Sequence, residues 1–191
     1  MLVSAAELLR ERGAAAVTVD AVLARSGAPR GSVYHHFPGG RGQILREALQ
    51  FAGDEIAATI DAAAGDSGTA LLRQFADMWR EALTTSGYSA GCPVLAAAIG
   101  SGDDEQQLAE LASEIITRWR QAARQAYVRD GFEPAEASAL ADISIAAMEG
   151  AVVLCRSTRS LDPLNDVAEQ LEFLTRAREF VSKFGVPAAT S

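Results

Sequence analysis

Five residues in the stretch APRGSVYHHFPGG carry side chains that could do chemistry: Arg30, Ser32, Tyr34, His35 and His36. The two histidines are adjacent, and they are the only histidines in the chain. Three kinds of site could use such a cluster, namely a metal centre, a catalytic base or a surface that contacts DNA. Each kind of site makes a different demand on the spacing of the side chains.

The spacing argues against a metal centre and against catalysis. Neighbouring residues on a helix point about 100° apart, so one ion does not easily bind both imidazoles. No nearby Cys, Asp or Glu completes a tetrahedral set of metal ligands. A catalytic histidine would need a nucleophile and an orienting acid, and none is spaced to provide them. We therefore expect no metal, no cofactor and no enzyme activity.

A DNA-contacting helix fits the same residues better. Val33 and Phe37 are spaced i, i+4 and would point together into a core. The residues left on or near the outward faces are Arg30, Ser32, Tyr34 and His35. Arginine offers a forked donor for guanine edges, hydroxyl groups reach phosphates, and imidazole suits either. The alternative is a polar helix face that ends in a buried aromatic residue and has no ligand.

The elements that would position this helix can be read from the flanking residues. Thr18 is a suitable N-cap for a helix over 19–26, with Val17 as its hydrophobic staple. Gly27 permits the tight turn that ends this helix. Pro29 suits the first turn of a third helix that runs to about His36. The whole segment has the pattern of a helix-turn-helix.

The rest of the chain predicts further helices and no strands. Nearly half of the 191 residues are apolar, alanine is abundant and strand-like alternation is scarce. Besides a first helix over about 2–12, we expect helices at about 41–63, 69–86, 93–100, 103–130, 134–157 and 163–184. The predicted fold is all-α, with an N-terminal three-helix helix-turn-helix domain followed by a larger helical domain for ligand binding and dimerisation.

Charge divides the chain into a basic head and an acidic body. Residues 1–46 carry six arginines and three acidic residues, so they have a net charge of +3 within a chain whose net charge is −8. Cys92 and Cys155 lack metal-binding or redox spacing, which favours reduced thiols. We see no apolar run of transmembrane length and no signal pattern, and we expect a cytoplasmic protein with no membrane partner.

The segment TVDAVLARSGAPRGSVYHHFPGGRGQIL resembles the DNA-binding segment of the TetR family of bacterial transcriptional regulators. The shared features are a Thr that opens the second helix, a Gly in the turn, and a recognition helix of the form G-S/T-x-Y-x-H-F. The resemblance implies that Thr18, Ser32, Tyr34, His36 and Arg41 contact phosphates. It also implies that Arg30 and His35 face bases. GCPVLAAA and MEGAVVLCRSTRSLDPL further resemble the LmrA-like regulators of drug-resistance genes.

On this basis we expect a DNA-binding domain over 1–46 and an effector-binding and dimerisation domain over 47–191. The last predicted helix repeats apolar residues at steps of three and four, close to a heptad seam. The helix before it is rich in small residues that let a partner come close. The candidate dimerisation residues are Ala147, Gly150, Ala151, Val167, Leu171, Leu174, Arg178 and Val181. Packing within one chain would explain the same pattern, whereas the resemblance favours a homodimer.

A small-molecule pocket is expected where large apolar residues gather in the body. The candidate effector-binding residues are Leu72, Phe75, Met78, Trp79, Ile115, Trp119, Tyr127, Met148 and Val152. The same residues would also suit an ordinary core. The sequence thus predicts a homodimeric regulator, a repressor of double-stranded operator DNA that a small apolar or aromatic effector releases. A helix-turn-helix regulator or scaffold without an effector is the alternative.

Overall fold

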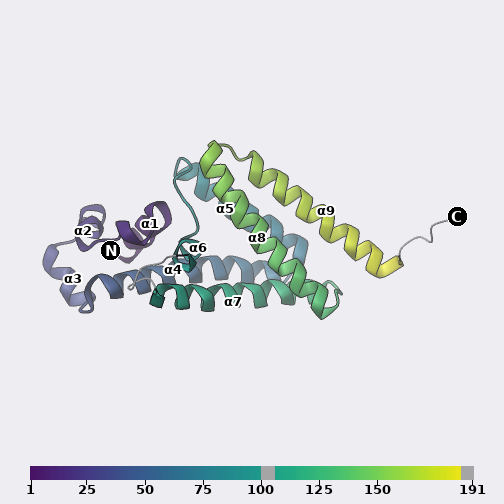
Figure 1. Ribbon diagram of the computed structural model, residues 1–191, viewed down its shortest axis with the longest axis horizontal. Coiled ribbons are helices and arrows are strands. Elements are labelled where there is room, and N and C mark those ends of the chain that lie inside the picture. The colour runs from purple at the N-terminus through teal and green to yellow at the C-terminus, as the bar shows by residue number, and fades with distance from the viewer. Residues whose placement is uncertain (100–105, 186–191) are drawn as a thin grey trace. The chain divides into compact units, whose positions relative to one another are not determined.

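The part of the chain that the structure describes, residues 1–99 and 106–185, is helical and contains no strand in the computed structural model (Figure 1). The elements are α1 (Leu2–Arg12), the 3₁₀ turn η1 (Ala14–Ala16), α2 (Val19–Ser26), α3 (Arg30–His36), α4 (Gly40–Ala64), α5 (Gly68–Thr85), α6 (Pro93–Ala98), α7 (Gln106–Arg129), α8 (Pro134–Thr158) and α9 (Asp162–Phe184). The all-α prediction is confirmed. The predicted start of α7 at 103 lies outside the described residues. The 3₁₀ turn η1 is absent from the sequence-based prediction, because a run of three alanines carries no periodic signal.

The packing divides the chain into two compact units. Unit 1 comprises Met1–Ala58 and Leu83–Arg118, and unit 2 comprises Thr59–Ala82 together with the chain from Trp119 onward. Helices α4, α5 and α7 each contribute residues to both units. The division predicted from sequence, at residue 46, follows the end of the helix-turn-helix pattern, whereas these units follow the packing of the long helices.

The helices of the N-terminal head form for local reasons that the sequence shows. The Ala21 N–H donates to Thr18 Oγ1 over 3.1 Å, so Thr18 caps α2 as predicted. Gly27 closes α2 with φ of 65°, a left-handed conformation that glycine adopts without strain. The head buries Val17 and Val22, which fixes α2 on the small core beside α1.

Unit 1 extends beyond the head because later segments pack on it. The Gly91 N–H donates to the Arg10 carbonyl over 3.0 Å, and α6 contacts α1. Along α4, Gly53 lies so close to α7 that a Cβ atom there would be 2.8 Å from Ile115 Cδ1. Arg118 of α7 and Asp54 of α4 form an ion pair 2.5 Å long beside this contact. The hydrogen bond from Arg118 holds the pKa of Asp54 below its usual range.

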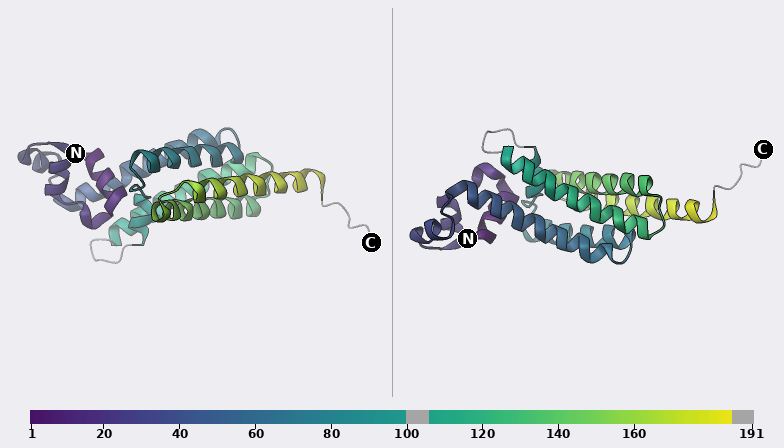
Figure 2. Two further views of the ribbon diagram at one scale, coloured as in Figure 1. Left: turned by 90° about the horizontal axis from the view of Figure 1, so that it is seen from above. Right: turned by 90° about the horizontal axis from the view of Figure 1, so that it is seen from below.

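Unit 2 is built around α8 and α9, which lie side by side and antiparallel after a short turn (Figures 1 and 2). Its largest fully buried side chains are Trp79, Trp119 and Tyr127. Arg73 of α5 forms hydrogen bonds of 2.8–3.1 Å with both carboxylate oxygens of Glu172 on α9. The unit thus has an apolar core, and an ion pair links α5 to α9.

The start of α5 depends on a glycine. The Gly68 N–H donates to Asp130 Oδ2 over 2.7 Å, and a Cβ atom at Gly68 would overlap the ring of Tyr127. We expect Gly68→Ala to lower the free energy of unfolding by about 1–3 kcal/mol, the usual effect of overpacking. Urea denaturation measures this. The control is Gly65→Ala, whose Cβ would meet no atom closer than 3.7 Å. Equal stability of both variants would contradict the close packing at Gly68.

Helix α8 corrects one expectation from the sequence. It is the one helix among the described residues that is long and apolar enough to cross a membrane by length and composition. The expectation that no segment reaches that length was therefore wrong. The apolar content has another explanation in this fold, since α8 buries residues such as Met148 and Val152 within unit 2. A helix buried along one side and apolar elsewhere passes the same compositional test.

Candidate functional site

Helix α3 exposes four of the five polar residues that the sequence singled out, leaves Ser32 half-buried, and buries its apolar residue. Val33 is fully buried and Phe37, which follows the helix, is 5% exposed. Tyr34 is 62% exposed, and His35 and His36 are also exposed, with their rings edge to face at a centroid distance of 5.1 Å. The helix therefore has one side anchored in the head and a polar side open to a ligand.

Arg30, the first residue of α3, carries an exposed charged group. Its side chain is 72% exposed, and its Nη2 lies 3.1 Å from Oδ1 of Asp20, which belongs to the first turn of α2. An exposed ion pair of this kind contributes little to folding stability. The pair can instead influence how the guanidinium of Arg30 is oriented.

Two of the three hydroxyl groups expected to contact phosphates, those of Thr18 and Ser32, are engaged locally. Thr18 Oγ1 accepts from the Ala21 N–H, which leaves its own proton available to a phosphate oxygen. Ser32 Oγ instead donates to the Pro29 carbonyl over 2.6 Å. To donate to a phosphate, Ser32 must first give up that bond.

Arg41 has a different environment from the one expected of a phosphate ligand. Its Nε donates to the Val17 carbonyl over 2.9 Å, and its Nη2 donates to the Ala14 carbonyl over 2.8 Å. The guanidinium thus ties the first turn of α4 to η1 and the residue before the α2 cap. Two of the five N–H donors of Arg41 thus brace the head, and its expected contact with phosphate stays a prediction.

Removal of this brace has a predictable cost. We expect Arg41→Ala to lower the free energy of unfolding by about 1.5–3 kcal/mol, because charged hydrogen bonds to buried backbone are lost. The melting temperature of the purified protein measures the effect. Arg46→Ala, one turn later on α4 and exposed, is the control for loss of an arginine from this helix. A variant at 41 as stable as the one at 46 would contradict the bracing role.

A second arginine, Arg25, links two helices of the head. Arg25 of α2 donates to both carboxylate oxygens of Glu11 on α1, over 2.7 and 3.0 Å, and lies 3.4 Å from Glu7. The hydrogen bond with Glu11 raises the pKa of Arg25 above its usual range. The contact fixes α1 against α2, so α3 projects from a braced base.

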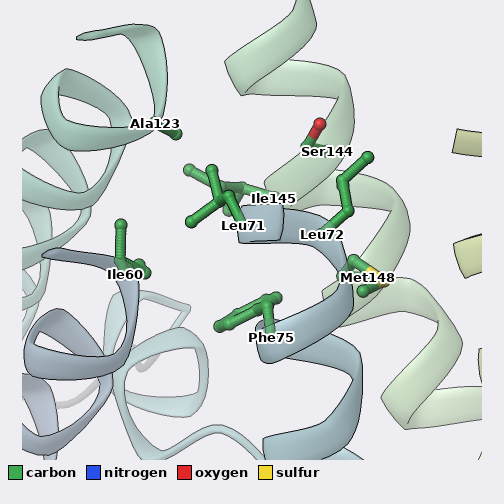
Figure 3. A pocket seen from close by; sticks show the side chains of 8 residues that line it. All are labelled: Ile60, Leu71, Leu72, Phe75, Ala123, Ser144, Ile145 and Met148. Carbon is green, nitrogen blue, oxygen red and sulfur yellow. The ribbon is translucent and has the colours of Figure 1, made fainter. Parts of the chain in front are cut away.

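Unit 2 contains an apolar cavity of about 20 Å³ (Figure 3). The residues that line it come from α4, α5, α7 and α8: Ile60, Leu71, Leu72, Phe75, Ala123, Ser144, Ile145 and Met148. A cavity of this volume has room for about one water molecule, so a larger ligand requires the helices to move apart.

The only polar side chain in the cavity wall is already satisfied. Ser144 Oγ donates to the Leu140 carbonyl over 2.7 Å and lies 2.7 Å from the Tyr127 hydroxyl, which is left as the donor between the two. Burial raises the pKa of Tyr127, so the phenol stays neutral. The wall therefore offers no charge and no spare donor to a ligand.

The structure separates the nine expected effector residues into groups. Leu72, Phe75 and Met148 line the cavity. Trp79, Trp119, Tyr127 and Val152 are buried core residues of unit 2 outside its lining, and Met78 is half-buried on α5. Ile115 belongs to unit 1, where it packs against Gly53. Periodicity marks all nine as inward-facing but does not distinguish core from cavity wall.

Helix α9 has two apolar sides. One side is buried in the protomer and comprises Leu164, Ala168, Leu171 and Thr175. Phe173 comes two residues after Leu171, which places it about 200° around the helix. It is 69% exposed, and Phe180 and Phe184 are exposed on the same side, with their rings 4.9 Å apart.

Helix α8, which packs against α9, also exposes apolar residues. Ile143, Val153 and Leu154 are each about half exposed, and the small residues Ala146 and Gly150 are exposed between them. We call the set Ile143, Val153, Leu154, Phe173, Phe180, Val181 and Phe184 the outer apolar face. Monomeric proteins rarely leave so many large apolar side chains in water, so such a face indicates an interface.

The expected dimerisation residues fall on both sides of α8 and α9. Gly150 and Val181 are exposed, and Ala147, Val167 and Leu174 are half-buried. Ala151 and Leu171 are instead buried inside the protomer, at 1% and 6% exposure. Arg178 pairs with Glu136 of α8 in the same chain at 2.7 Å. The predicted seam combined the inner and outer sides of α9, because both repeat apolar residues at steps of three and four.

Two parts of the chain match families of bacterial regulators. Residues 1–48 match the tetR family of bacterial regulatory proteins, and residues 69–170 match the C-terminal domain of LmrA/YxaF-like transcriptional regulators. An HTH-type transcriptional regulator of Mycobacterium tuberculosis is 43% identical over 182 residues, which is 93% of each chain. The chain belongs to the TetR family.

More distant relatives agree with this assignment. The HTH-type transcriptional regulator LmrA of Bacillus subtilis is 24% identical over 86% of this chain and 88% of its own. Crystal structures of TetR regulators from Rhodobacter sphaeroides and Legionella pneumophila share the fold, each with a TM-score of 0.77. They are 23% and 18% identical and cover 90% and 91% of this chain and 95% and 94% of their own. The predicted resemblance, including the LmrA-like body, is confirmed, and TetR-family proteins are DNA-binding transcriptional regulators rather than enzymes.

Several residues of this TetR-family chain that matter here had no clear signal in the sequence. Asp20 looks like an ordinary acid in the first turn of a helix, where it complements the helix dipole. Ile60 and Ser144 belong to the cavity wall through helix packing that no local pattern reveals. The exposed Phe173 and Phe184 do carry a signal, since their spacing on α9 places them on one side of the helix.

Proposed function

We propose that the protein is a cytoplasmic repressor that binds a palindromic operator as a homodimer and is released by a small neutral molecule. Residues 1–46 contact the DNA, and residues 47–191 carry the dimer interface and the effector pocket. The observation that carries the proposal is the outer apolar face on α8 and α9, opposite the buried side of α9. A second copy of the same face is its natural cover, since two such helix pairs would together form a four-helix bundle.

A two-fold dimer supplies the link to a palindrome. An isologous interface relates the two heads by the same two-fold axis, so each α3 meets an identical half-site in inverted orientation. The contacts proposed for each α3 are Arg30 and His35 to bases, and Ser32, Tyr34 and His36 to phosphates, with Thr18 of α2 on the same backbone. Arg41 supports this surface from behind through its bonds to η1 and Val17.

A repressor makes a direct prediction about transcription. Added protein should retard the duplex that flanks its own coding region, and it should reduce transcription from a promoter on that duplex. A rise in transcription on binding would make the protein an activator, and no retardation of any duplex would overturn the proposal.

The cavity in unit 2 indicates the chemistry of the effector. Its wall is apolar and uncharged, so a charged molecule would lose its hydration without compensation. A neutral aromatic or aliphatic molecule fits, provided that α4, α5, α7 and α8 separate to admit it. If the molecule binds better when the two α3 helices are at a spacing that does not fit the operator, it releases the DNA. The release is limited to the difference in its affinity for the two states, typically about 1–3 kcal/mol.

Titration of neutral aromatic compounds tests the effector site. Trp79 and Trp119 lie in unit 2, and their fluorescence should report binding. Operator DNA should weaken the affinity by about 5- to 150-fold, because coupling between two sites is reciprocal. Ala123→Met should fill the cavity and abolish binding, whereas Ala122→Met, at the adjacent half-buried position, should not. Equal affinity with and without DNA would exclude release by this route. Failure of every compound would favour a regulator or scaffold without an effector, which the small cavity also suits.

A further inference from the structure

We infer that Asp20 of α2 is a specificity-determining residue that positions Arg30 for a base and keeps it from phosphate. The inference rests on the proposed contact between α3 and DNA. It concerns a residue outside α3 whose carboxylate is 3.1 Å from the guanidinium of Arg30, with both side chains more than 70% exposed.

The carboxylate of Asp20 should weaken DNA binding, so its presence on this surface requires an explanation. An exposed carboxylate on the basic head, beside a group expected to enter the major groove, repels phosphates. Asp20 also lies in the first turn of α2, where it complements the helix dipole. That role needs a carboxylate near the helix start, but it does not require contact with Arg30 of the next helix.

The geometry of the pair shows what the contact can do. The closest approach in the pair is between Nη2 of Arg30 and Oδ1 of Asp20, and a guanidinium has five N–H donors in all. Guanine is read by two parallel donors that reach N7 and O6. A carboxylate that holds one edge of the guanidinium leaves another edge for this bidentate contact. It also restricts part of the rotamer freedom that the arginine would otherwise lose on binding.

The same contact works against non-specific binding. A flexible arginine meets any phosphate as a point charge, whereas an arginine already paired with a carboxylate gains less from a phosphate. Loss of the Asp20 carboxylate should therefore strengthen binding to unrelated sequences and weaken the preference for the correct base. A purely structural acid would change both affinities together.

The test uses the full-length protein and two duplexes. One is the duplex that the unsubstituted protein enriches from a random-sequence library, and the other is a scrambled duplex of equal length. Asp20→Asn should lower the ratio of the two affinities by about 3- to 10-fold, the cost of ordering one long side chain. Asp20→Glu keeps the charge at the start of α2, and melting temperatures show that the variants are folded. The control is Glu114→Gln on α7, which removes one exposed charge from the same unit.

A second selection makes the test specific to the pair. The base position at which Arg30→Ala loses its preference identifies the base that Arg30 reads. Asp20→Asn should weaken the preference at that same position, and it should have no further effect on the ratio in the Arg30→Ala background. If Asp20→Asn changes both affinities by the factor seen for Glu114→Gln, or if it raises the ratio, the inference is wrong. If the unsubstituted protein enriches no duplex, the proposed function is wrong, and the inference, which rests on it, is wrong as well.

Discussion

Val153→Asp is expected to convert the protein from a dimer into a folded monomer. Val153 belongs to the outer apolar face and is 56% exposed, so an aspartate there does not disturb the core of the protomer. In the proposed dimer the carboxylate would be buried without a partner, which costs about 3–5 kcal/mol for each charge. Because the interface is isologous, each dimer would carry two such charges. Sedimentation velocity at micromolar concentration measures the change.

Two control variants separate loss of the dimer from loss of the fold. Leu171→Asp replaces a residue buried inside the protomer and should unfold unit 2. Val128→Asp replaces an apolar residue on α7 that is 40% exposed and outside the face, and it should leave the oligomeric state unchanged. A dimeric Val153→Asp variant, or a monomeric parent protein, would show that the outer apolar face is not the interface.

Arg30→Ala is expected to weaken operator binding by about 1–3 kcal/mol and to relax the preference at one base pair in each half-site. The arginine is the exposed forked donor at the start of α3, and alanine has nothing to offer guanine. Tyr34→Phe should behave differently, since a phenol that donates to phosphate adds affinity for all sequences about equally. Competition binding with a library of single-base variants measures both effects.

The matched control for charge is Arg124→Ala, an exposed arginine on α7 in unit 2. It removes the same charge and should leave both affinity and base preference nearly unchanged. If Arg30→Ala weakens all duplexes by one factor, Arg30 contacts phosphate rather than a base. If it has no effect at all, α3 does not read DNA through this residue.

The head was predictable because its signals are local. The Thr18 cap, the Gly27 turn and the spacing of Val33 and Phe37 each act within a few residues, and they agree on the same three helices. The polar set on α3 follows from the same periodicity, since the buried residues define which side faces outward.

Two features could not be predicted from the sequence: the hydrogen bonds of Arg41, and which of the two apolar sides of α9 is exposed. In both cases the reason is physical. The partners of Arg41 are backbone carbonyls of Ala14 and Val17, and side-chain types carry no information about carbonyl positions. On α9, Leu171 and Phe173 both belong to apolar repeats at helical spacing. The sequence shows that two repeats exist, but only the packing of α9 in the protomer shows which one remains in water.

The most direct test of the account is the architecture of the DNA site bound by the parent protein, determined by selection from random sequence together with the protein-to-DNA stoichiometry. A two-fold dimer with one α3 in each half-site should select two inverted half-sites, occupied by two chains, whose centres are about one helical turn, 34–36 Å, or a multiple of it apart. A single half-site saturated by one chain, or half-sites in direct repeat, would contradict it.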